Sequence, residues 1–245
     1  MKKLFALLLT LIPAMVLVAA PKLFASFAAP AAAERQAREV APFTAVTAAG
    51  SMNVVVRQGS PQRVEVEASA ADQAKVETEV EGGCLRVGRR REGREMWKTE
   101  RFDGLVTVYV TASSLTALSV AGSGDLRVEG AVQASNFEVS VAGSGNLLLP
   151  QLTAQTLKTS LAGSGNISLS GTCPQHRVSI AGSGNVRADN LRTDDTEVRI
   201  SGSGNVRANA AKTLNSRISG SGDVLVSGAA QISSSKSGSG SVRRL

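Results

Sequence analysis

A Gly-Ser-Gly tripeptide recurs seven times in the second half of the chain, and this repetition constrains the fold more than any other feature. Neighbouring copies lie 18 to 21 residues apart. Self-similarity at a nearly constant period indicates a repeat architecture, in which each unit packs mainly on its two neighbours. The tripeptides begin at Gly122, Gly143, Gly163, Gly182, Gly202, Gly220 and Gly238.

Apolar residues alternate with other residues on both sides of each tripeptide, which is the period-two pattern of a β-strand. The position four residues after the first glycine holds Leu, Ile or Val in every copy. Glycine bends the chain sharply between two short strands, because it reaches positive φ without steric cost. The sequence therefore predicts an all-β fold, a parallel β-solenoid with Gly-Ser-Gly-Asn/Asp turns and a coil of about 20 residues.

The residue after each tripeptide is Asn or Asp in six of the seven copies. Both side chains tolerate left-handed backbone and bond to neighbouring amides. If coils stack about 4.8 Å apart, these side chains form one ladder, with Asn in the middle, where facing carboxylates would repel. The predicted ladder consists of Asp125, Asn146, Asn166, Asn185, Asn205 and Asp223.

Residues 1–33 are expected to be a secretory signal peptide and not part of the fold. Lys2 and Lys3 precede an apolar run, and small residues that suit a cleavage site follow. An uncleaved membrane anchor is the alternative, although the run is short and contains Pro13. We expect export to the periplasm or the cell surface. Without the three lysines of this segment the formal net charge falls from +7 to +4, too little to predict nucleic-acid binding.

The rest of the chain is expected to form one domain. Residues 34–42 are interpreted as a linker and residues 43–245 as a single solenoid, irregular over 43–115 and regular over 116–245. Gly50-Ser51-Met52-Asn53 repeats the turn pattern with Met in place of the second glycine. At the other end Lys236 occupies a core position, and a polar last coil would keep an exposed strand edge from pairing with another chain.

The residue types that carry most catalytic and metal chemistry are scarce. His176 is the only histidine, so a histidine cluster is not available, and we expect it at the surface. Asp194 and Asp195 are expected in a solvated turn and not as a glycosidase pair. Calcium-binding repeats need more aspartate than these turns supply. We expect no metal, no cofactor and no enzymatic activity, with a polysaccharide-acting β-helix enzyme as the third hypothesis.

Cys84 and Cys173 are the candidates for a disulfide bond. An exported protein meets an oxidising environment, which permits one. Residues so far apart in sequence lie several coils apart in a solenoid, however, and should not meet. We therefore expect two separate thiols.

Serine and arginine occupy two outward positions of the repeat, five residues after and three residues before the first glycine. We expect both positions on one flank, which would offer a regular face to an anionic or sugar polymer. The alternative is that these residues serve solubility alone. A tryptophan beside an arginine cluster would either stack on a sugar ring or close the core. The candidate binding residues are Arg127, Arg187, Arg207, Arg199, Arg217 and Trp97.

The opening Gly-Ser-Met-Asn-Val-Val-Val, the Gly-Gly-Cys-Leu-Arg-Val strand and the array of Gly-Ser-Gly-Asn/Asp turns resemble a bacterial family of unknown function, the "putative auto-transporter adhesin, head GIN domain". The resemblance covers residues 43–245 and implies a right-handed β-helix-like fold and an envelope location. We expect a non-enzymatic envelope protein that binds a surface polymer or a partner in the manner of an adhesin. The alternative is a structural or signalling module that contacts another envelope protein. The sequence leaves the ligand and the oligomeric state open.

Overall fold

The structure is a computed structural model of the chain, and it describes residues 33–90 and 102–245. These residues belong to one compact unit, Ala32–Leu245. The predicted signal peptide, except for residue 33, and Trp97 lie outside the described residues. The fold is nearly all β, with 73% of the described residues in strands and 3% in helix.

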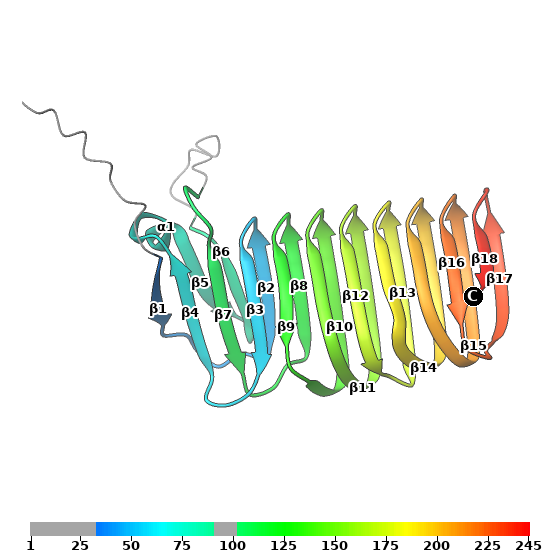
Figure 1. The fold of residues 1–245 in the computed structure, drawn as a ribbon, viewed down its shortest axis with the longest axis horizontal. Helices are drawn as coiled ribbons and strands as arrows, with labels where there is room; N and C mark the ends of the chain where they lie inside the picture. The colour runs from blue at the N-terminus through cyan, green and yellow to red at the C-terminus, as the bar shows by residue number, and fades with distance from the viewer. Residues whose placement is uncertain (1–32, 91–101) are drawn as a thin grey trace, which may run out of the picture. The chain divides into compact units, whose positions relative to one another are not determined.

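The described residues form eighteen strands and one short helix (Figure 1). The N-terminal elements are β1 (Glu34–Arg38), β2 (Ala45–Gly50), β3 (Asn53–Gln58), β4 (Arg63–Ala68), α1 (Ala70–Lys75), β5 (Val76–Glu81), β6 (Cys84–Arg89) and β7 (Thr107–Ala112). The next are β8 (Ala117–Gly122), β9 (Asp125–Glu129), β10 (Val132–Gly143), β11 (Asn146–Gly163), β12 (Asn166–Thr172) and β13 (Gln175–Gly182). The last are β14 (Asn185–Gly202), β15 (Asn205–Gly220), β16 (Asp223–Ser227), β17 (Gln231–Ser237) and β18 (Ser241–Arg244).

From β8 onward every strand pairing is parallel, and the register keeps the sequence repeat aligned. Gly122 lies opposite Gly143, and Gly143 lies opposite Gly163. The turns therefore stack along one edge, the upper edge in Figure 1. The structure confirms the predicted parallel β-solenoid, which has about six turns.

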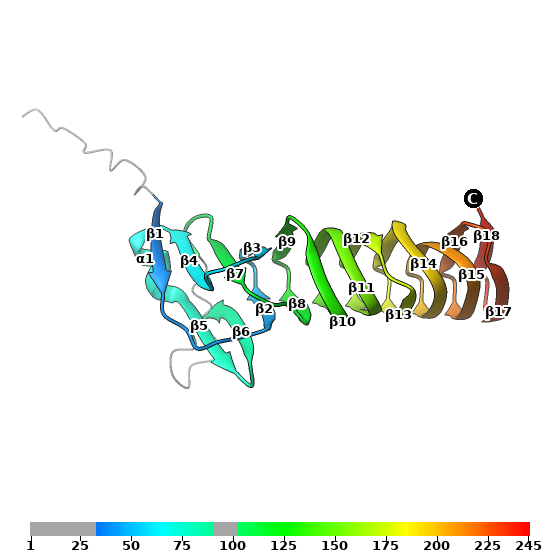
Figure 2. The ribbon, with the colours of Figure 1, turned by 90° about the horizontal axis from the view of Figure 1, so that it is seen from below.

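Each regular coil has three sides, as the burial pattern shows. In β11 buried and outward residues alternate except at two places, Pro150-Gln151 and Gln155-Thr156, where two successive residues point away from the core. The chain turns a corner at each place, and the Gly-Ser-Gly turn makes the third corner. We call the outward residues just after the turn the exit face, those of the middle segment the base face, and those that lead into the next turn the entry face. Figure 2 looks at the coils from the side opposite the turns.

Close contact between stacked backbones explains the glycines of the turns. Ser144 and Gly145 donate backbone hydrogen bonds to the Gly122 carbonyl oxygen of the preceding coil, at 2.9 and 3.0 Å. Gly143 has a φ of +126°, and a Cβ at either Gly143 or Gly145 would overlap a carbonyl oxygen of that coil. A side chain is excluded at both positions because the neighbouring backbone already occupies its space.

The parallel stack extends to β2 and β3, which pair in register with β8 and β9. Beyond them the pairing changes, since β4 with β7, β5 with β6 and β1 with β4 are all antiparallel. The inward residues of β2 to β9 belong to the same hydrophobic core as those of the later coils, and this core is mostly aliphatic, with two phenylalanines, Phe43 and Phe137. Along residues 33–90 and 102–245, no helix is long and apolar enough to cross a membrane.

The surface placement predicted for His176 was wrong. This residue is only 3% exposed and points into the core from β13, where it lies between Leu157 and Thr196 in the inward row. The alternation that buries Val178 and Ile180 also turns residue 176 inward. Its Nε2 lies 3.0 Å from Thr159 Oγ1, whereas its Nδ1 has no hydrogen-bond partner among the described residues. Burial lowers the pKa of this imidazole to about 4.

Candidate functional site

A groove of about 1020 Å³ crosses the entry face, over β8, β10, β11, β13, β14 and β15. It lies where each coil leaves its base face and begins the strand that leads into the next turn. Leu115, Phe137 and Leu157 are among the buried residues beneath it. Two rows of outward side chains, two residues apart along each strand, form its sides.

The first row of the groove consists of uncharged polar residues with one aspartate, each opposite the next in the parallel register. Thr156 Oγ1 donates to Asn136 Oδ1 at 2.6 Å, and Thr213 Oγ1 donates to Asp195 Oδ1 at 2.7 Å. Amide and hydroxyl groups thus repeat at the spacing of strands, about 4.8 Å. The row is Asn136, Thr156, Gln175, Asp195 and Thr213.

The second row carries charges that largely compensate one another. Lys158 Nζ lies 2.7 Å from Glu138 Oε1, and Arg177 Nε lies 2.8 Å from Glu197 Oε2. Arg199 also contacts Glu197, at 2.6 Å. The hydrogen bond from Arg177, helped by Arg199, holds the pKa of the Glu197 carboxyl below its usual range. This carboxylate is therefore ionised at neutral pH, unlike a general acid, which needs a raised pKa.

Asp194 and Asp195 lie within β14, at the corner between the base and entry faces, and both side chains point outward. Asp194 pairs with Lys212 at 3.0 Å, and Asp195 accepts the hydrogen bond from Thr213. Thr193 and Thr196 on either side turn inward and bond to each other at 2.7 Å. Within the described parts of the chain, no cluster of three or more His, Cys, Asp or Glu residues could hold a metal ion.

The two outward positions that hold serine and arginine do not lie on one flank, so that prediction was wrong. Arg127, Arg187 and Arg207 occupy one row of the exit face. Arg199 and Arg217 face each other on the entry face, on the other side of the Gly-Ser-Gly corner. The turn carries the chain from one sheet into the next, so residues before and after it belong to different faces.

The row of Asn and Asp residues after the turns forms a hydrogen-bonded ladder along the edge of the exit face. Each Asn donates its Nδ2 to the Oδ1 of the preceding coil, at 2.8 Å from Asn146 to Asp125 and 2.9 Å from Asn166 to Asn146. The next two bonds, from Asn185 and from Asn205, are 3.1 and 3.0 Å long. Asn suits the inner positions because it both donates and accepts. The ladder ends where the backbone N–H of Asp223 donates to Asn205 Oδ1.

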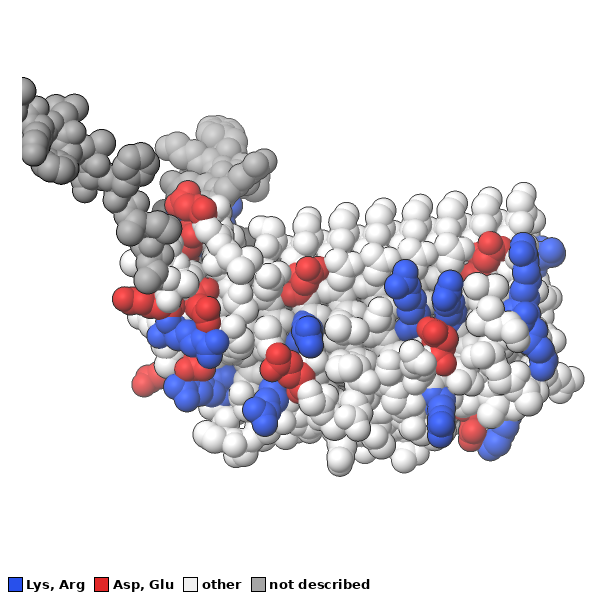
Figure 3. Space-filling view, in the orientation of Figure 1, with Lys and Arg blue, Asp and Glu red and all other residues white. Residues whose placement is uncertain are grey.

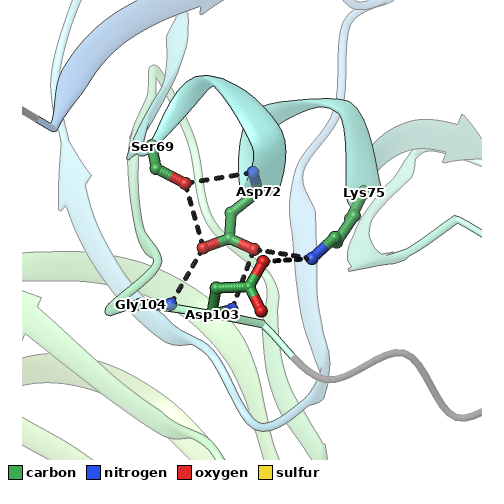
Figure 4. Close-up of polar contacts among 5 residues, drawn as sticks. All are labelled: Ser69, Asp72, Lys75, Asp103 and Gly104. Atoms are coloured by element: carbon green, nitrogen blue, oxygen red, sulfur yellow. Dashed lines mark hydrogen bonds and ion pairs between the residues drawn. The ribbon is translucent and has the colours of Figure 1, made fainter. Parts of the chain in front are cut away.

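A polar cluster in the N-terminal part was missed by the sequence analysis (Figure 4). Asp72 on α1 is fully buried, and its carboxylate accepts from Lys75 Nζ at 3.1 Å and from the backbone N–H groups of Asp103 and Gly104 at 3.0 and 2.9 Å. Burial raises the pKa of this carboxyl, but the hydrogen bonds outweigh that effect and lower it. The signal was the Ser69-x-x-Asp72 spacing of a helix cap, and Ser69 does accept from the Asp72 N–H at 3.2 Å.

Both cysteines are free thiols in the structure. Cys84 at the start of β6 is half-buried, with its Sγ 3.3 Å from Thr47 Oγ1. Cys173 is buried and donates to the Gln175 carbonyl at 3.0 Å. Burial raises the pKa of the Cys173 thiol to about 11.

Solved structures share this fold. A crystal structure of a putative adhesin from Bacteroides fragilis has a TM-score of 0.79 at 23% identity, over 87% of this chain and 97% of that one. A putative lipid binding protein from Parabacteroides distasonis has a TM-score of 0.71 at 24% identity, with the same two shares covered. A putative adhesin from Parabacteroides merdae has a TM-score of 0.69 at 17% identity, over 87% and 96%.

No curated protein matches this chain. A family model does match, over residues 42–230, which include the strands from β2 to β16. By this match the chain belongs to the family described as "putative auto-transporter adhesin, head GIN domain".

Proposed function

We propose that this protein is a non-enzymatic, exported binding module that holds an extended, hydroxyl-rich polymer, such as an envelope polysaccharide, in the entry-face groove. The observation that carries the proposal is that the strands lining the groove stack in register. Its polar side chains repeat on successive coils about 4.8 Å apart, which is close to the length of one pyranose ring. A polymer lying along the solenoid axis would meet similar groups at each residue.

The composition of the groove favours a neutral polymer. Its basic residues, Lys158 and Arg177, are paired with Glu138 and Glu197, so the groove presents little net charge. The amides of Gln175 and Asn215 and the hydroxyls of Thr156 and Thr213 can both donate and accept, as sugar hydroxyls do. Each contact is weak, and repetition over several coils would supply affinity by avidity.

The family supports the adhesin-like role and export to the cell envelope. The ionised state of Glu197 supports a binding role over glycoside hydrolysis, since a hydrolase needs one carboxylic acid that stays protonated. The remaining alternative, contact with another envelope protein, makes no use of the repeating polar rows.

The test is the retention of neutral polysaccharides by three forms of the full chain: the wild type, the double groove variant Gln175→Ala/Asn215→Ala, and a control variant. Gln175→Ala and Asn215→Ala remove two exposed amides from the groove, whereas Gln151→Ala removes the same kind of group at the corner between the exit and base faces. We expect the double variant Gln175→Ala/Asn215→Ala to bind about thirtyfold more weakly, given roughly 1 kcal/mol for each of two lost hydrogen bonds, and Gln151→Ala to bind as the wild type does. Equal binding by all variants, or no binding of any polysaccharide, would reject the groove as the site.

A further inference from the structure

We infer that the exit face holds a second site, specific for an oxyanion group, at the arginine pair Arg187 and Arg207. These residues lie directly opposite each other in the parallel register of β14 and β15. Both side chains are exposed, and they leave adjacent strands, about 4.8 Å apart, on the same face. The neighbours in the same row are uncharged, Ser168 on one side and Leu225 on the other.

The pair brings two positive charges together in register without a counter-ion in the described parts of the chain. Among the described residues, neither Arg187 nor Arg207 has a carboxylate partner within 4.0 Å. Other exposed basic residues of the coils do, including Lys158, Arg177, Arg199 and Lys212. Two like charges in register repel each other, and an anion between them would remove that repulsion. Arginine also presents a planar fork of donors that matches carboxylate, sulfate and phosphate oxygens.

The ladder beside the pair adds further donors. Asn185 and Asn205 lie two residues before Arg187 and Arg207, so they share the outward side of the same strands. Each Oδ1 already accepts a hydrogen bond, from Asn205 and from the Asp223 N–H respectively. Each Nδ2 uses one of its two hydrogens in the ladder, which leaves one for a ligand. The groups still free to bind are therefore mostly N–H donors.

These four residues border a shallow depression of about 380 Å³, whose other members include Asp223, Leu225 and Arg243. Two carboxylates lie near the pair and would repel an anion. Asp189 is two residues after Arg187 on the same outward side of β14, and Asp223 Oδ1 is occupied by the Ser241 backbone N–H and hydroxyl. The site is therefore placed at the two arginines, away from Asp223. Lys and Arg also gather over the last coils on the face seen in Figure 3. The site shares no residue with the entry-face groove.

The experiment measures binding of the full chain to dextran sulfate, polygalacturonate and polyphosphate, which carry sulfate, carboxylate and phosphate groups, with uncharged dextran as reference. Arg187→Ser/Arg207→Ser removes the pair. Arg127→Ser/Arg192→Ser is the matched control, because it removes the same net charge from two other exposed arginines with no partner among the described residues. Arg187→Lys/Arg207→Lys keeps the charge without the planar fork.

We expect the wild type to bind at least one anionic polymer and the Ser pair variant to bind it at least tenfold more weakly. The control should change binding less than threefold, and the Lys variant should be intermediate. An equal loss in the control would show that net charge alone attracts polyanions, and would overturn the site. Failure of the wild type to bind any of the three anions would overturn it as well. The groove variants should leave this binding unchanged, so the two sites fail or succeed separately.

Discussion

The buried histidine predicts a specific loss of stability in mild acid. His176 is neutral in the folded protein, where burial lowers its pKa to about 4, and it returns to its ordinary pKa of 6.5 in the unfolded chain. Below pH 6.5 the imidazole therefore binds a proton in the unfolded chain but stays unprotonated in the folded protein, so folding becomes less favourable as the pH falls. The loss ends near pH 4, once the folded protein also takes up the proton.

The magnitude follows from the difference between the two pKa values. At about 1.36 kcal/mol for each tenfold change in proton affinity, the full effect is roughly 3 kcal/mol, and about 2 kcal/mol of it should be lost between pH 7 and pH 5. The groups packed against the imidazole, Thr159, Leu157 and Thr196, carry no charge. The neighbouring charged residues Lys158, Arg177 and Glu197 occupy outward positions.

The measurement is urea unfolding from pH 7 to pH 4.5, for the wild type and for His176→Leu/Thr159→Val. The second change removes the hydroxyl that would otherwise be left buried without its partner. The chain has one histidine, and the carboxyl groups whose pKa values are lowered by their hydrogen bonds, Asp72, Glu197 and Asp223, lose most of their contribution below this window. We expect the double variant to show a nearly flat profile. A wild-type profile that is already flat, or an unchanged slope in the variant, would refute the assignment of the pH dependence to His176.

Three further predictions concern the polar clusters and the thiols. Asp72→Ala should lower the free energy of unfolding by about 3 kcal/mol, because it leaves two partly buried backbone N–H donors and Lys75 without their acceptor; a loss below about 1 kcal/mol in urea unfolding would contradict this. Asn166→Asp should lower the free energy of unfolding by roughly 1 kcal/mol in the same assay, since an ionised aspartate cannot donate a hydrogen bond to Asn146. Asp125→Asn, at the first position of the ladder, should change this free energy little. Cys173 should resist a thiol reagent at pH 8 while the protein is folded, because burial raises its pKa to about 11; mass mapping that finds Cys173 labelled before Cys84 would count against it.

The repeat explains why so much of the fold could be predicted. A Gly-Ser-Gly turn, an Asn after it and an aliphatic residue at a constant offset specify where each coil begins and which residues point inward. Parallel stacking then places equivalent positions opposite each other, so the Asn146–Asn166 bond follows from the period alone. The same logic placed Arg187 next to Arg207.

The errors occurred where the repeat does not specify the path of the chain. The corners at Pro150-Gln151 and Gln155-Thr156 have no constant sequence signature, and they decide that each coil has three faces. The strand of the entry face begins after such a corner, and its register there decides that the His176 side chain points inward. The contacts of Asp72 with Asp103 and Gly104 join segments about 30 residues apart, which no local pattern reports.

The sequence by itself determined the strand type, the coil period and the ladder, because these depend on residues within one period and on its repetition. Only the tertiary structure decided that Arg187 and Arg199 lie on different faces and that Gln175 and Asn215 share a groove. Those relations depend on the angle through which the backbone turns at each corner. That angle is set by the packing of inward side chains from three faces against one core, and a one-dimensional pattern does not contain it.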